Sequence, residues 1–120
     1  AVVAKNEVTP SPAPKEEKAP EVAIIEENLA KLRSSDKEVK QTAVVFIRQI
    51  DSSYAPAIQT LTTALADENQ TVRAVAAYAL GKIGPAAKSA VPKLKELLED
   101  PHIGVQKYAR QALGKIEAEQ

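Results

Sequence analysis

The sequence predicts an all-α fold in which three helical hairpins stack into a short solenoid. Apolar residues recur at intervals of three and four from residue 22 onward, as on amphipathic helices. The pentapeptide ALGKI also occurs twice, 33 residues apart, at 79–83 and 112–116. One hairpin cannot bury its apolar face alone, whereas stacked hairpins share a continuous core.

Composition excludes several classes of site. Basic and acidic residues balance at 16 each, so net charge indicates neither a nucleic acid nor an anionic membrane as partner. The absence of Cys excludes disulfides, thiol catalysis and Cys-ligated zinc, and a single His excludes a His-pair metal site. No apolar run approaches the roughly 18 residues of a membrane span.

The first segment, residues 1–20, is predicted to be a disordered Pro/Ala-rich tail ahead of a repeat domain at 21–120. Pro10, Pro12, Pro14 and Pro20 are half of the eight prolines, and the bonds before them favour extended conformations. The chain starts at Ala1 and contains no Met. We therefore expect an exported or periplasmic protein, with a cytoplasmic fragment as the alternative.

The first three helices are expected at 22–33, 37–50 and 55–66. Their apolar rows are Ile25, Leu29 and Leu32, then Val39, Ala43, Phe46, Ile47 and Ile50, then Ile58, Leu61 and Leu65. The segments SSDKE and DSSYAP separate these rows, and their Ser and Asp side chains can cap helix starts.

The last three helices are expected at 70–83, 87–99 and 103–117. Gly84 should end the first of them in the left-handed conformation, and Pro85 follows as a stop signal. The segments DENQ and DPHIG mark the remaining breaks.

The helices pair into repeats at about 22–50, 55–83 and 88–116. A shift of 33 residues gives eleven identities over positions 57–83, and a weaker match relates the first repeat to the second. Gly81 and Gly114 lie inside predicted helices, where each glycine costs about 0.5–1 kcal/mol. Their recurrence at the same position of two repeats predicts that a larger residue would clash there. ALGKI is not a phosphate loop, because Ala76 and Ile83 stand where that motif requires Gly and Ser or Thr.

Residues 57–84 and 90–116 resemble HEAT repeats, particularly the short HEAT-like type named after phycobilisome lyases. The resemblance covers about 22–117 and implies a right-handed α-α superhelix whose second helices line the concave face. The family's Asp and Val-Arg appear as Asp67, Val72 and Arg73, which implies an Asp–Arg contact within the middle repeat. HEAT arrays mostly act as non-catalytic binding scaffolds, and this is the leading functional interpretation.

Charge on the second helices predicts the partner. Across 37–50, 70–83 and 103–116 the one acid is Glu38, against eight basic residues: Lys37, Lys40, Arg48, Arg73, Lys82, Lys107, Arg110 and Lys115. A basic inner face would attract an acidic or mixed protein segment. The competing interpretation is that these are solvated faces of amphipathic helices.

An apolar strip adds to this surface. Val44, Val45 and Tyr78 fall in predicted outward columns, as interface anchors do, although a tail or a further repeat could also cover them. The predicted partner-binding residues are Val44, Val45, Arg73, Tyr78, Lys82, Lys107 and Arg110.

No catalytic, cofactor-binding or metal-binding residue is predicted. His102 is expected to cap a helix or face solvent, since no nucleophile is placed to suit it. Two alternatives remain: an accessory subunit of a chromophore lyase, and a nucleic-acid-binding HEAT-like protein, although nucleic acid is not expected for a neutral chain without Trp. A monomer is favoured.

Overall fold

The computed structural model describes residues 19–117, which form helices and turns without a strand. The first hairpin pairs α3 (Pro20–Leu32) with α4 (Lys37–Ile47), and the 3₁₀ helix η1 (Ser52–Ala57), α5 (Ile58–Ala64) and α6 (Gln70–Ile83) form the second. The third contains η2 (Gly84–Ala90), α7 (Val91–Glu96), η3 (Leu97–Glu99) and α8 (Ile103–Glu117). The predicted all-α solenoid is confirmed. The predicted tail lies outside the described residues except for Ala19 and Pro20.

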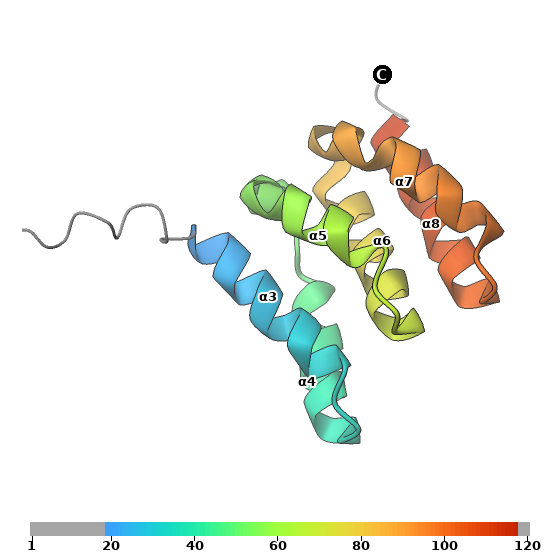
Figure 1. Cartoon of the computed structure of the whole chain (residues 1–120). Coiled ribbons are helices and arrows are strands. Elements are labelled where there is room, and N and C mark those ends of the chain that lie inside the picture. Colours follow the sequence, from blue (N-terminus) through green and yellow to red (C-terminus); the bar gives the residue numbers. More distant parts are fainter. Residues whose placement is uncertain (1–18, 118–120) are drawn as a thin grey trace, which may run out of the picture.

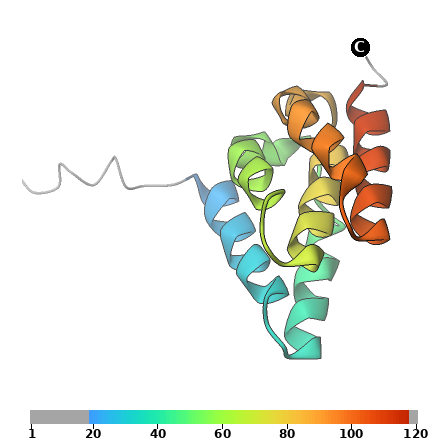
Figure 2. The same ribbon diagram turned by 45° about the vertical axis from the view of Figure 1, so that its right-hand side comes forward.

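The helices form two layers. Figures 1 and 2 show α3, α5 and α7 along one side of the stack and α4, α6 and α8 along the other. The six expected helices correspond to these hairpin arms, with two corrections. The arms expected at 55–66 and 87–99 begin as 3₁₀ helices, with non-helical backbone at Tyr54 and Ala87, which are 33 residues apart. The helix expected to end at residue 50 ends at Ile47, where tighter three-residue hydrogen bonds close its last turn.

Side-chain caps begin the second helices of the first two repeats. Asp36 accepts the backbone N–H groups of Glu38 and Val39, and Asn69 does the same for the start of α6. At the other end of α6, Gly84 has φ 86° and ψ −150°. Its φ is positive as expected, but this ψ lies in an extended region open essentially to glycine alone rather than in the left-handed helical region.

The core is built from aliphatic side chains with alanines where helices approach most closely. Leu61, Leu80 and Leu94 are fully buried, and so are Ala76 and Ala79 on α6 and Ala109 on α8. A methyl group added to Gly81 would lie 3.0 Å from the Ala112 Cα atom on α8. A methyl group on Gly114 would meet no atom within 4 Å. The predicted clash is therefore confirmed at Gly81 and wrong at Gly114, where no described helix packs.

A candidate binding groove on the second helices

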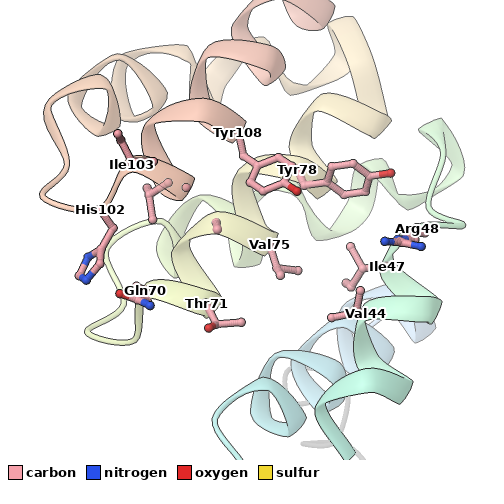
Figure 3. Close-up of a pocket in the computed structure, with 13 residues that line it drawn as sticks. Val44, Ile47, Arg48, Gln70, Thr71, Val75, Tyr78, His102, Ile103 and Tyr108 are labelled. Atoms are coloured by element: carbon pink, nitrogen blue, oxygen red, sulfur yellow. The ribbon is translucent and has the colours of Figure 1, made fainter. Parts of the chain in front are cut away.

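A groove of about 360 Å³ runs across the second helices of all three repeats. Figure 3 shows side chains from α4, α6 and α8 converging on it. Its lining residues are Val44, Ile47, Arg48, Gln70, Thr71, Ala74, Val75, Tyr78, His102, Ile103, Gly104, Val105 and Tyr108. All three second helices contribute residues to this single hollow.

The groove opens because α4 cannot approach α6 as closely as α6 approaches α8. On α6 the positions facing α8 carry Gly81 and the fully buried Ala77. The corresponding positions on α4, 33 residues earlier, carry Arg48 and Val44, and both line the groove. A guanidinium and a branched side chain occupy the volume that glycine and alanine leave to a neighbouring helix. The two pairs of second helices are therefore spaced differently, as Figures 1 and 2 show.

The centre of the groove is apolar and aromatic. Val44 and Ile47 from α4 face Val75 from α6 (Figure 3). Above them the rings of Tyr78 and Tyr108 meet edge to face, with centroids 5.7 Å apart and planes at 86°. This arrangement is favourable for aromatic pairs and holds both rings in place. Both tyrosines are half-buried, so part of each remains available to a ligand.

The rim is polar. Thr71 and Gln70 lie at the start of α6, and His102 and Ile103 lie at the start of α8. Arg48 is exposed at the end of α4, and among residues 19–117 no carboxylate forms an ion pair with its guanidinium group. It is thus a cation next to an apolar hollow with its hydrogen-bonding capacity open to a ligand.

Arg73, predicted as a partner-binding residue, has a structural role instead. Its Nε and Nη2 atoms donate to the Asp100 carboxylate at 2.8 and 3.1 Å, while Nη1 donates to the backbone oxygens of Asp67 and Glu68. The expected contact with Asp67 therefore runs through the main chain, and the ion pair joins the second repeat to the third. The side chains of Arg73 and Asp100 are only 13% and 5% exposed, so this guanidinium is not available to a partner.

A second ion pair joins the first repeat to the second, between Arg33 and Asp67. The Arg33 hydrogen bond holds the pKa of Asp67 below its usual value. Burial alone would raise the pKa of Asp100, but the hydrogen bonds from Arg73 and from the His102 backbone outweigh it and lower that pKa as well.

These shifts predict that the chain loses stability in acid. A lowered folded-state pKa means that the native carboxylate binds protons less readily than the unfolded one. The stabilisation is fully present above the unfolded pKa, near 4, and is lost as pH falls through the lower folded values. In urea titrations from pH 7 to pH 2, the difference in unfolding free energy between wild type and Asp100→Asn should shrink as pH falls. A difference that is constant across this range would contradict the assignment.

The other predicted site residues are dispersed. Val44 and Tyr78 line the groove. The prediction that their positions in the repeat face outward holds only in part, because Ala77, which is equivalent to Val44 in the second repeat, is fully buried. Val45 is 48% exposed and outside the lining. Lys82, Lys107 and Arg110 also lie outside it, with the Lys107 ammonium 5.8 Å from the Tyr108 ring centre.

Arg48 was predicted only as one of eight basic residues on the second helices, and most of the apolar lining was not predicted. The lining residues absent from the predicted partner-binding set include Arg48, Ile47, Thr71, Val75, Ile103 and Tyr108. One signal for Arg48 was present. It occupies the position at which the other two repeats carry glycine.

Comparison with known sequences agrees with the geometry. A family model described as HEAT repeats matches residues 25–114. No curated protein matches the chain. Within residues 19–117, no helix combines the length and apolar character needed to cross a membrane, and no cluster of three His, Cys, Asp or Glu side chains is arranged to hold a metal ion.

Proposed function

This chain belongs to the HEAT-repeat family, and from that premise we propose that it is a protein-interaction module whose groove binds a segment of a partner protein. HEAT repeats commonly mediate protein–protein interaction. The observation that carries the proposal is the groove itself, an apolar hollow framed by Val44, Val75 and two tyrosines on the second helices. Anchors of interfaces are typically large apolar side chains inserted into such hollows.

Arg48 supports an acidic or mixed segment as the partner. A carboxylate placed beside an apolar anchor would pair with this guanidinium, and the low dielectric of a filled groove would strengthen the bond. The ammonium of Lys107, 5.8 Å from the Tyr108 ring centre, adds to the positive potential that guides an acidic segment toward this face. Arg73 is omitted from the proposed surface because its guanidinium is committed to Asp100.

The groove can be tested without knowing the natural partner. Short random peptides displayed on phage are selected on the wild-type chain, and their dissociation constants are measured for wild type, Arg48→Glu and Lys95→Glu. Lys95 is exposed on α7, in the other layer, so its variant makes the same charge change away from the groove. Arg48→Glu should weaken binding about tenfold, equivalent to about 1.4 kcal/mol.

Two outcomes would contradict the proposal. Peptides that lose equal affinity in both variants respond to net charge rather than to the groove. Peptides that bind Arg48→Glu as tightly as wild type do not use its guanidinium. Thermal unfolding of each variant checks that the fold is intact, and exposed substitutions of this kind usually change stability by less than about 0.5 kcal/mol.

A further inference from the structure

The sequence supplies its own candidate for the groove. Residues 9–17, TPSPAPKEE, precede the described helices and combine three prolines with two glutamates. We propose that this segment docks in the groove of the same chain as an intramolecular ligand that a partner must displace. This inference rests on the proposed function of the groove.

Proline chemistry fits the lining of the groove. Alternating prolines favour the polyproline II conformation, which has no internal hydrogen bonds and leaves its carbonyl groups to be satisfied by other donors. Such segments dock in grooves lined by aromatic rings. Here Tyr78 and Tyr108 supply the rings, and the hydroxyl of Thr71 and the amide of Gln70 supply donors on the rim.

Charge fits as well. Polyproline II has three residues per turn, so Pro10, Ala13 and Glu16 fall on one edge of the segment. Ser11, Pro14 and Glu17 fall on a second edge, and only the third edge carries lysine. Two of the three edges therefore present a proline in line with a carboxylate. The groove presents the matching pair: two tyrosines and the guanidinium of Arg48, which forms no ion pair with a carboxylate of residues 19–117.

The connection is long enough. α3 and α4 are antiparallel arms of one hairpin, so the start of α3 at Pro20 and Arg48 after α4 lie at the same end of that hairpin. Polyproline II rises about 3.1 Å per residue, and the nine steps from Pro20 to Ser11 span about 28 Å. The axes of two packed helices lie about 8–10 Å apart, so the four steps from Pro20 to Glu16, about 12 Å, span the distance from α3 to α4, and the steps beyond Glu16 extend across the groove. Covalent attachment also gives the segment an effective concentration in the millimolar range, so weak contacts suffice.

A single spin label can locate the segment in the full-length chain. The protein has no Cys, so Ser11→Cys creates a unique attachment point. Methyl signals of Val44, Ile47 and Val75 in the groove are compared with those of Ile58 and Val91 in the other layer, before and after the nitroxide is reduced. The groove methyls should lose most of their intensity, while the methyls of the other layer keep theirs. Broadening that is absent or equal in the two sets would overturn the proposal.

A matched variant tests the chemistry. Adding Pro10→Gly, Pro12→Gly and Pro14→Gly to the labelled chain should restore the groove signals, because the extended preference is removed. A mixture of two chains distinguishes broadening within one chain from broadening between chains. One chain carries the nitroxide at Ser11→Cys without isotope labels, and the other is the isotope-labelled wild-type chain, which has no Cys and no nitroxide. Groove broadening in that mixture at the level of the single-chain experiment would mean that a second copy supplies the segment, which also overturns the intramolecular proposal.

The groove and its occupant fail separately. If residues 9–17 dock, the triple glycine variant should bind phage-selected peptides several-fold more tightly than wild type, because the competing occupant is weakened. Selected peptides that bind both chains equally, with loss on Arg48→Glu, would overturn the docked segment and leave the proposed function intact. Peptides whose affinity is unchanged by Arg48→Glu would contradict the groove as the binding site, and the docking of residues 9–17 would be contradicted with it.

Discussion

Replacing Arg73 with alanine should lower the free energy of unfolding by about 3 kcal/mol, the largest effect expected of any polar substitution in this chain. The guanidinium joins Asp100 of the third repeat to the backbone oxygens of Asp67 and Glu68 in the second. Its removal leaves the Asp100 carboxylate buried, with the His102 backbone N–H as its remaining close donor. An unpaired buried carboxylate is costly because burial removes its hydration.

Denaturant titration at pH 7 measures this effect, and two variants sharpen it. Arg73→Lys should recover only part of the loss, because an ammonium group cannot donate to two carboxylate oxygens in the planar geometry of guanidinium. Arg110→Ala, on an exposed position of α8, should change stability by less than about 0.5 kcal/mol. An Arg73→Ala loss below about 1 kcal/mol would mean that the ion pair contributes little and that apolar packing alone joins these repeats.

The two ALGKI glycines should respond to alanine in opposite directions. Gly81→Ala should destabilise the chain by about 1–2 kcal/mol, because the new methyl lies 3.0 Å from the Ala112 Cα atom and forces α6 and α8 apart. The gain of about 1 kcal/mol in helix propensity offsets only part of that strain. Gly114→Ala should stabilise the chain by about 0.5–1 kcal/mol, since the same propensity gain meets open space.

Identical local sequence makes this pair its own control. Both glycines stand between leucine and lysine in the same register of a second helix, so propensity and unfolded-chain effects cancel in the comparison. Thermal or urea unfolding of the two single variants is sufficient. If both substitutions stabilise, the contact between α6 and α8 is looser than described; if both destabilise, something other than this contact acts at Gly114.

Elements were predictable from the sequence because each carries a strong local signal. The 3.6-residue apolar period located every hairpin arm, and the capping predicted for Ser and Asp in SSDKE is made by Asp36. The 3₁₀ starts of the arms at 52–57 and 84–90 were not predicted. Their kinks lie at Tyr54 and Ala87, whose side chains give no common signal, so the repeated position rather than the residue type marks them.

The binding surface was harder to predict because it depends on spacing between helices. Charge alone placed Arg73 on the concave face, yet a long side chain in that register reaches the loop of the next repeat and finds Asp100. The groove forms because Arg48 and Val44 occupy the positions that Gly81 and Ala77 occupy in the second repeat. The importance of this difference is visible only once the structure shows that Gly81 packs against α8. A repeat alignment shows where residues differ, whereas only the packing shows which difference opens a space.

The central claim is that ligands bind in the groove on the second helices. It is tested most directly by titrating a phage-selected peptide into the isotope-labelled chain and recording which signals shift. We expect the largest shifts at Val44, Val75, Tyr78 and Tyr108, with Ile58 and Val91 unchanged. Shifts concentrated on α5 and α7, with the groove signals unmoved, would place binding on the opposite layer and contradict it.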